Sequence, residues 1–168
     1  MTIDNKKMSE YFNPENKDNK SFSRQLDFDI LSQAHPDIQY VMSEFIKIKN
    51  VEFNIASTSI RTREQQIEFM NQGYTTTLNS HHFPKAFPEL NNSVYICAVD
   101  MAISKVTLTN YGYDLYKVNS FSEDSSKKLL EEIEFSVYSY WGKLIDSIAK
   151  NAYEQKLTRY RVYPDALS

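Results

Sequence analysis

Three stretches of the chain carry apolar residues at helical spacing. The first follows His35-Pro36, where apolar residues recur every three or four positions and Pro suits the first helical position. A second helix is expected over residues 63–72, with Ile67, Phe69 and Met70 facing inward and Gly73 ending it. A third, long helix follows Ser122, since a hydroxyl and two acidic neighbours suit a helix N-terminus. The inward stripes of the first and third helices are Ile38, Val41, Met42, Phe45 and Ile46, and Leu130, Ile133, Val137, Trp141, Leu144, Ile148 and Ala152.

Four other stretches have the alternating or β-rich pattern of strands. They cover residues 51–60, 94–103, 111–118 and 158–163, and the second of these is apolar enough for a central strand. Residues 74–92 contain Pro84, Pro88 and Asn91-Asn92, so we expect them to be irregular. The order of elements predicts an α+β domain, with helices packed on a small antiparallel sheet.

Residues 1–28 differ from the rest, because they are rich in Asn, Lys, Asp and Ser and show no helical or strand period. We interpret them as an extended polar N-terminal arm on a single domain of residues 29–168. Such an arm lies either on its own domain or on another protein subunit. The second alternative implies a larger assembly.

Composition excludes several classes of protein. The 168 residues carry a net charge of −3, which argues against direct nucleic-acid binding. Three glycines leave no Gly-rich phosphate loop, and the lone Cys97 excludes an intramolecular disulfide and a Cys-based zinc cluster. The first residues lack an apolar signal-peptide core, and no apolar run approaches the ~20 residues of a membrane span, so we expect a soluble cytosolic chain.

Four polar motifs follow one another along the chain. They are Ser59-Ile-Arg-Thr-Arg-Glu-Gln-Gln66, Gln72-Gly-Tyr-Thr75, Asn79-Ser-His-His82 and Ala98-Val-Asp100. In this order they resemble the M15 family of zinc peptidases, which includes D-Ala-D-Ala carboxypeptidases and the L-alanyl-D-glutamate peptidases of phage endolysins. The resemblance covers roughly residues 36–104 and implies the core fold of Hedgehog and DD-peptidase domains.

The resemblance also implies roles for individual residues. It assigns the zinc ligands to His82 and Asp100, with His81 as an alternative to His82, and gives Arg61 the substrate carboxylate or the developing oxyanion. Zinc with an open position polarises a carbonyl and lowers the pKa of a water molecule. The general base of the family corresponds to Asp165, which begins the end of the chain at Asp165-Ala-Leu-Ser168.

The sequence departs from the family pattern in its ligand set. No histidine follows His82, and Ser168 stands where the third ligand is expected. Between His82 and Asp100 lie 17 residues, a longer separation than in the family, which we interpret as a loop opened by an insertion. His35 is a further candidate ligand. Because two protein ligands hold zinc weakly, we expect a degenerate site without stoichiometric zinc.

Structural roles remain open for the same residues. A carboxylate in an apolar strand needs a partner, so Asp100 could pair with Arg61 and hold the cleft closed, or accept a hydrogen bond from His82. Gln65 and Gln66 suit a solvated helix surface, Cys97 a small buried position, and Trp141 the core.

Three functions follow from these alternatives. We favour a non-catalytic or weakly active M15-peptidase-like protein: a phage virion or tail component, or a module that contacts peptidoglycan. It would reside in the virion, or in the host cytoplasm before assembly or lysis. An active zinc-dependent peptidoglycan endopeptidase or carboxypeptidase is the alternative. A regulatory protein that inhibits a host factor is the third.

Overall fold

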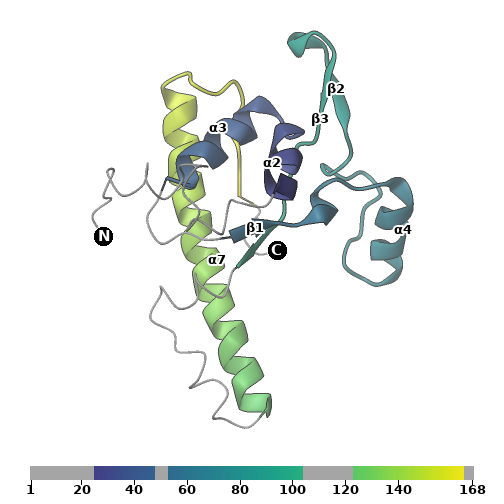
Figure 1. The fold of residues 1–168 in the computed structure, drawn as a ribbon, viewed down its shortest axis with the longest axis vertical. Coiled ribbons are helices and arrows are strands. Elements are labelled where there is room, and N and C mark those ends of the chain that lie inside the picture. Colours follow the sequence, from purple (N-terminus) through teal and green to yellow (C-terminus); the bar gives the residue numbers. More distant parts are fainter. Residues whose placement is uncertain (1–24, 48–52, 104–122, 165–168) are drawn as a thin grey trace.

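The structure is a computed structural model, and it describes residues 25–47, 53–103 and 123–164. Figure 1 shows a long helix, α7 (Glu123–Glu154), with α3 (Pro36–Phe45) lying against its C-terminal half. The strand β1 (Phe53–Ile55) crosses beside them, and a hairpin and a short helix project from the same side of the body. The α+β class predicted from the sequence is confirmed.

The helix α3 forms where the periodic pattern predicts it. His35 caps its N-terminus, since Nδ1 accepts a hydrogen bond from the Asp37 amide at 3.1 Å, and Pro36 occupies the first turn. Four of the predicted inward residues of this helix are buried and Ile46 is partly buried.

The helix α2 (Gln25–Ser32) begins inside residues 1–28, where the sequence analysis expected an extended arm without a helix. Polar and apolar residues alternate at its start, where Asp27 is buried, and Ile30 packs in the core with 2% of its surface exposed. The Asp27 carboxylate accepts a hydrogen bond from the Ile55 amide at 2.8 Å, which ties α2 to β1. Residues 1–24 lie outside the described part of the chain.

The long helix α7 begins and runs as predicted. Of its expected stripe, Val137, Trp141 and Ala152 are buried, while Leu144 and Ile148 are partly buried. The side chains of Leu130 and Ile133 lie outside the described set. Ile145 and Ala149 are also buried, so the buried stripe of α7 is wider than predicted.

The strands are shorter than predicted and form two separate ribbons. β1 pairs antiparallel with β4 (Met101–Ile103), with Phe53 opposite Ile103 and Ile55 opposite Met101. β2 (Lys85–Phe87) pairs antiparallel with β3 (Ser93–Tyr95), and the short 3-10 helix η2 (Pro88–Leu90) connects them.

Three strand predictions are therefore wrong. The expected central strand over residues 94–103 is two strands, β3 and β4, separated by a bend, because the two strands pair with different partners. After β1 the chain forms the 3-10 helix η1 (Ser57–Ser59), and residues 158–163 form a bend followed by irregular backbone. Residues 74–92, expected to be irregular, contain β2. The expected strand over residues 111–118 lies outside the described residues.

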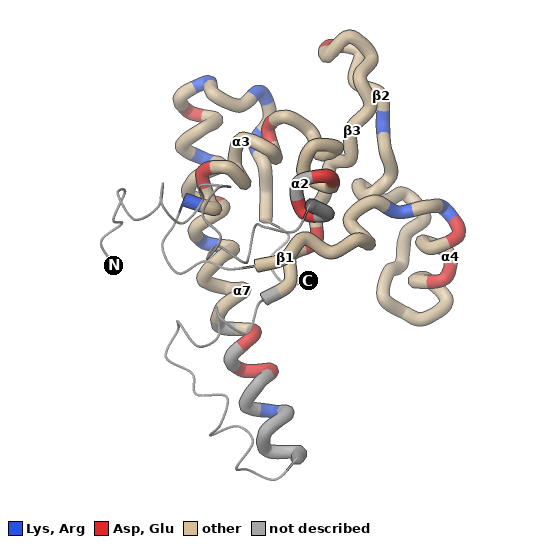
Figure 2. Tube along the Cα trace, in the orientation of Figure 1, with Lys and Arg blue, Asp and Glu red and all other residues tan. Residues whose placement is uncertain are grey.

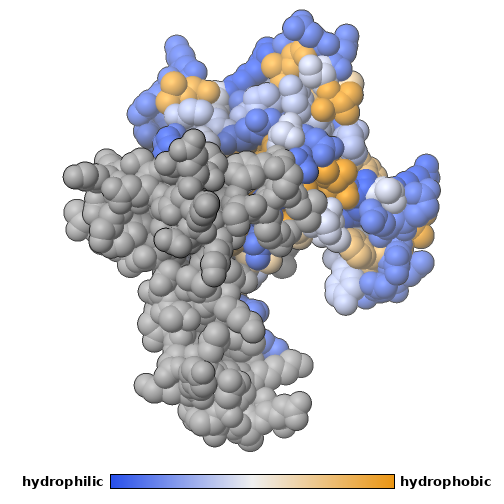
Figure 3. All heavy atoms as spheres, viewed as in Figure 1, coloured by the Kyte–Doolittle hydropathy of each residue, from blue (hydrophilic) through white to orange (hydrophobic). Residues whose placement is uncertain are grey.

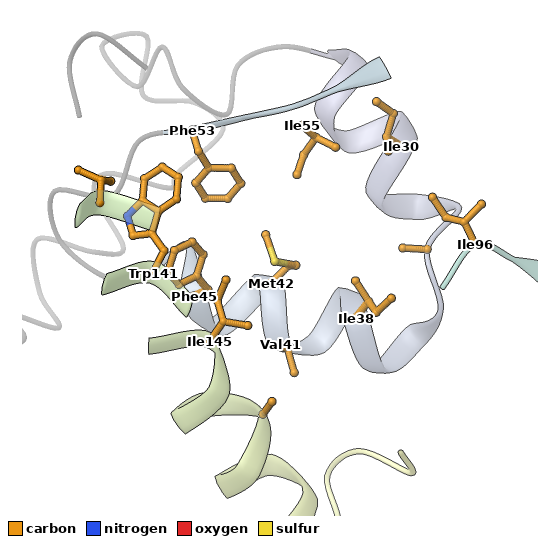
Figure 4. Packing of buried hydrophobic residues seen from close by; sticks show 13 residues of the cluster. Ile30, Ile38, Val41, Met42, Phe45, Phe53, Ile55, Ile96, Trp141 and Ile145 are labelled. Carbon is orange, nitrogen blue, oxygen red and sulfur yellow. The ribbon is translucent and has the colours of Figure 1, made fainter. Parts of the chain in front are cut away.

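The core lies where β1, α3 and α7 meet. Figure 4 shows the rings of Phe45, Phe53 and Trp141 gathered at one end of it. Their centroids lie 5.5 to 6.0 Å apart, with the indole edge-on to both phenyl rings. The aliphatic side chains of Ile30, Val41, Met42, Ile55 and Ile96 fill the rest.

The helix α4 (Arg63–Asn71) projects from this body. A capping box starts it, since the Thr62 hydroxyl accepts from the Gln65 amide and the Gln65 side chain accepts from the Thr62 amide. It ends at Gly73, whose φ of 78° gives the left-handed turn that was predicted.

The predicted inward face of α4 is wrong for two of its three residues, since only Phe69 is partly buried, against Arg61. Ile67 and Met70 are 42% and 36% exposed, whereas the polar Gln66 is buried. Hydrophobic residues are visible around α4 in Figure 3, and Figure 2 shows basic residues at its start followed by acidic residues along it.

Truncating the aromatic end of the core tests this packing. Phe45→Ala removes a fully buried ring and should lower the free energy of unfolding by about 3–5 kcal/mol, measured by chemical denaturation. Phe135→Ala, the same substitution at a residue that is 60% exposed, should change it by no more than about 0.5 kcal/mol. Equal losses in the two variants would contradict this account of the core.

Aromatic rings fasten the β2–β3 hairpin to the body. Phe87 and Tyr95 lie edge-on to the buried His35 ring, with centroids 4.8 and 6.0 Å away, and Tyr160 contacts it from the segment after α7. The Tyr160 hydroxyl donates a hydrogen bond to Glu89 at the hairpin tip. This bond is the main cause that holds the pKa of Glu89 below its usual range and raises the pKa of Tyr160.

The Glu89–Tyr160 bond should therefore weaken in acid. A lowered carboxyl pKa gives a contribution that is present above the unfolded-state pKa and lost as the pH falls through the folded-state pKa. In Tyr160→Phe the Glu89 carboxyl should titrate at higher pH than in the wild type, as measured by NMR of the side-chain carboxyl carbon. An unchanged titration of Glu89 would show that the hydroxyl does not hold it.

Candidate functional site

The site forms where β1 ends and β4 begins. Beyond the paired strands the ladder gains one further bond, from the Ala56 amide to the Asp100 carbonyl at 2.9 Å, which places Asp100 beside the turn after β1. In that turn Ser59 is fully buried, and its hydroxyl accepts a hydrogen bond from the Asp100 amide at 2.8 Å. The sheet thus delivers Asp100 to a fixed position.

His82 reaches the same position from the loop after α4. The Ser80 hydroxyl accepts from the His82 amide at 3.2 Å, which accounts for the Ser-x-His spacing. The Nδ1 atom of His82 lies 3.0 Å from the Ser59 carbonyl oxygen, and its Nε2 atom lies 3.5 Å from Asp100 Oδ1. Ser59 therefore contacts both residues that the resemblance assigns as ligands.

Arg61 lies on the other side of the Asp100 carboxylate. Its Nη2 atom is 3.4 Å from Asp100 Oδ2, so the predicted ion pair is present. Nη1 donates to Gln66 Oε1 at 2.8 Å, and the guanidinium lies over the Phe69 ring at 4.7 Å. The Arg61 side chain is only 11% exposed, against 42% for Asp100.

A cleft of about 370 Å³ opens beside His82 and Asp100. Its walls come from α3, from α7 and from the segments around residues 97–101 and 162–164, and most of its lining side chains are apolar. Val99, Met101, Tyr138, Trp141 and Ile145 are among them. Arg61 does not line this cleft, whereas His81, His82, Cys97 and Asp100 do.

The long segment between His82 and Asp100 does not move these two residues apart, because its two ends are held together by hydrogen bonds. Residues 85–95 form the β2–β3 hairpin, and at its base the Cys97 amide donates to the His81 carbonyl at 2.8 Å. The Arg61 amide also donates to the His82 carbonyl at 3.3 Å. The expectation that the insertion opens the loop is therefore wrong, because the added residues pair with one another.

The chemistry of the facing atoms fits a metal ion. With its proton on Nδ1, directed at the Ser59 carbonyl, the His82 ring presents a bare Nε2 to a carboxylate oxygen. Two acceptors that face each other need a cation between them or a proton on Nε2, and at 3.5 Å a proton would make only a long hydrogen bond. Zinc bonds of about 2.1 Å in tetrahedral geometry place two ligands roughly 3.4 Å apart.

The remaining candidate residues occupy different surroundings. His35 caps α3 and does not line the cleft, while His81 is exposed beside it. Asp165 lies outside the described residues. Among residues 25–47, 53–103 and 123–164 no three His, Cys, Asp or Glu side chains converge as a metal site, so His82 and Asp100 form a pair there.

Three residues of the site were missed by sequence reasoning. Ser59 and Ser80 belong to the motifs but received no role, and Gln66 was interpreted as a solvated helix residue. All three are buried. The signal available in the sequence was that Arg61 precedes the expected helix start and Gln66 lies in its first turn. Residues on either side of a helix start lie close together, so a contact between the two side chains could have been expected.

Comparison with known proteins adds no assignment: no family model matches the chain, and no curated protein or solved structure is significantly similar to it. Within the described ranges, no helix combines the length and apolar character that crossing a membrane requires.

Cys97 gives a chemical probe of the cleft. Burial raises the pKa of its thiol, an effect that nearby Lys85 only partly offsets, so the thiolate fraction at pH 8 should be small. We expect iodoacetamide to alkylate the folded protein several-fold more slowly than the same chain in urea. Since Cys97 is the one cysteine of the chain, mass spectrometry reports it directly, and equal rates would contradict its burial.

Proposed function

We propose that this protein is an M15-peptidase-like protein that binds stem peptides of peptidoglycan in the cleft beside His82 and Asp100. The observation that carries the proposal is the 3.5 Å separation of His82 Nε2 and Asp100 Oδ1, with Nδ1 directed at the Ser59 carbonyl. This spacing matches two ligands of one zinc ion. It favours zinc binding more than the sequence alone did.

The residues divide the work in a simple way. His82 and Asp100 would hold a zinc ion, which would supply a Lewis acid to polarise a peptide carbonyl and lower the pKa of a water molecule. The apolar walls contributed by Val99, Met101 and Trp141 bind aliphatic parts of a peptide and keep bulk water away from His82 and Asp100.

Weak or absent turnover follows from the ligand set. Zinc peptidase sites use three protein ligands, whereas the described residues bring two together. We therefore expect a protein that contacts the cell wall more than it cuts it, as a phage virion or tail component would. Other subunits of such an assembly are its expected partners.

An active zinc-dependent endopeptidase or carboxypeptidase is the second candidate. The observation that favours it is that Val162, Tyr163 and Pro164 line the cleft. The described chain therefore reaches the site as far as Pro164, and Asp165 follows Pro164 directly in the sequence.

Zinc content tests the shared part of both candidates. The purified protein should bind zinc weakly and at no more than one ion per chain, as measured by titration against a chromophoric chelator. His82→Ala should lose this binding, because one of two ligands is gone, while the neighbouring exposed His81→Ala should retain it. No zinc in the wild type, or equal zinc in both variants, would overturn the proposal.

Peptidoglycan then separates the two candidates. Purified sacculi should sediment the wild-type protein, and new amino groups of stem peptides should be counted after incubation. Sedimentation without amine release supports the non-catalytic protein. Zinc-dependent release that is abolished in His82→Ala identifies the active peptidase. The absence of both sedimentation and amine release would contradict a cell-wall function.

A further inference from the structure

Arg61 contacts Asp100, one of the two candidate metal ligands, and does not line the cleft. We propose that Arg61 is a positioning residue that holds the Asp100 carboxylate against His82, and that Gln66 and Phe69 fix Arg61 for this purpose. The inference rests on the proposed function in so far as the His82–Asp100 pair binds a metal. This role differs from the one that the resemblance implies, in which Arg61 binds the substrate directly.

The contacts of Asp100 carry the first step. Its Oδ2 atom takes the ion pair with Arg61 Nη2 at 3.4 Å, and its Oδ1 atom faces His82 Nε2 at 3.5 Å. Its amide is held by the Ser59 hydroxyl at 2.8 Å. With the backbone and one carboxylate oxygen fixed, rotation of the carboxylate is restricted, and the second oxygen stays directed at the histidine.

Burial of Arg61 carries the second step. Its side chain is 11% exposed and does not line the cleft that His82 and Asp100 border. A guanidinium that binds a substrate carboxylate needs its donors in the cleft, but here one Nη atom is directed at Asp100 and the other at Gln66. Arg61 therefore acts on the site through Asp100.

Gln66 carries the third step. It is 1% exposed on a helix whose other described residues are mostly exposed. Its Oε1 atom accepts from Arg61 Nη1 at 2.8 Å, while its Nε2 atom donates to the Thr77 carbonyl at 2.7 Å. Because both ends of the amide are engaged, the orientation of Oε1 toward Arg61 is fixed.

Phe69 completes the support. It lies three residues after Gln66, so both side chains are on one face of α4, and its ring lies 4.7 Å below the guanidinium carbon of Arg61. The capping box at Thr62 fixes where α4 starts and hence where this face meets Arg61. The guanidinium is thus held from the side by an amide and from below by a ring.

Gln66→Leu tests the inference because it keeps the charge of Arg61 and removes its support. Zinc affinity, measured by competition with a chromophoric chelator, should fall about ten-fold, as for loss of other residues that orient metal ligands. Gln72→Leu is the matched control, an exposed glutamine at the end of the same helix, and should bind zinc like the wild type. Circular dichroism and thermal unfolding establish that each variant is folded.

A second readout does not depend on metal. In protein labelled with ¹⁵N-arginine, the Nη hydrogens of a held Arg61 give separate NMR signals, which should average in Gln66→Leu and remain separate in Gln72→Leu. Phe69→Leu, which keeps an apolar side chain, should act in the same direction with a loss of a few-fold in zinc affinity. This variant keeps the test decisive if Gln66→Leu does not fold.

Failure of this inference and of the proposed function are distinguishable. If wild-type protein binds no zinc, the proposed function fails, and the arginine signals alone decide whether Gln66 holds Arg61. Unchanged zinc affinity with separate Arg61 signals in Gln66→Leu would overturn the inference. So would unchanged zinc affinity with weaker binding of stem peptide, because Arg61 would then contact substrate.

Discussion

The site depends on the two contacts that the buried Ser59 makes with Asp100 and His82. Its hydroxyl accepts from the Asp100 amide at 2.8 Å, and its carbonyl oxygen lies 3.0 Å from His82 Nδ1. Asp100 and His82 come from different segments, so one residue of the 3-10 helix η1 sets their relative position. Since Ser59 is fully buried, neither bond competes with solvent. The position of β1 in turn depends on Phe53, which packs against Phe45 and Trp141.

The helices α3, α4 and α7 could be predicted from the sequence, whereas α2 was missed and most of the strands were not predicted correctly. The stripes of α3 and α7 repeat over many residues, so the apolar face is determined by period alone. The stretch from Val94 to Ile103 has the composition of one strand, but the chain bends at residues 97–100 so that Asp100 meets Ser59. Tertiary hydrogen bonds thus override local β propensity. Val94, apolar and expected in a central strand, is 57% exposed on the hairpin.

The candidate site was accessible to sequence reasoning where a motif marks it, and inaccessible where polar residues are buried. His82, Asp100 and Arg61 were singled out, and in the structure Asp100 lies 3.5 Å from His82 and 3.4 Å from Arg61. Gln66 was assigned to the solvated surface because glutamine is usually exposed. Its burial follows from Arg61 and Thr77, which satisfy both ends of the amide, and neither partner is visible in the pattern of α4 itself.

The long separation between His82 and Asp100 shows how a site can tolerate added chain. What matters for a pair of ligands is where the ends of the intervening segment are held, since a flexible loop costs little more as it lengthens. Here the ends are joined by the bond from Cys97 to His81, and the added residues form a hairpin that packs on His35 through Phe87 and Tyr95. The hairpin therefore adds its own contacts on a side of the molecule away from the cleft lining. A count of residues between two ligands says little about the distance between their side chains.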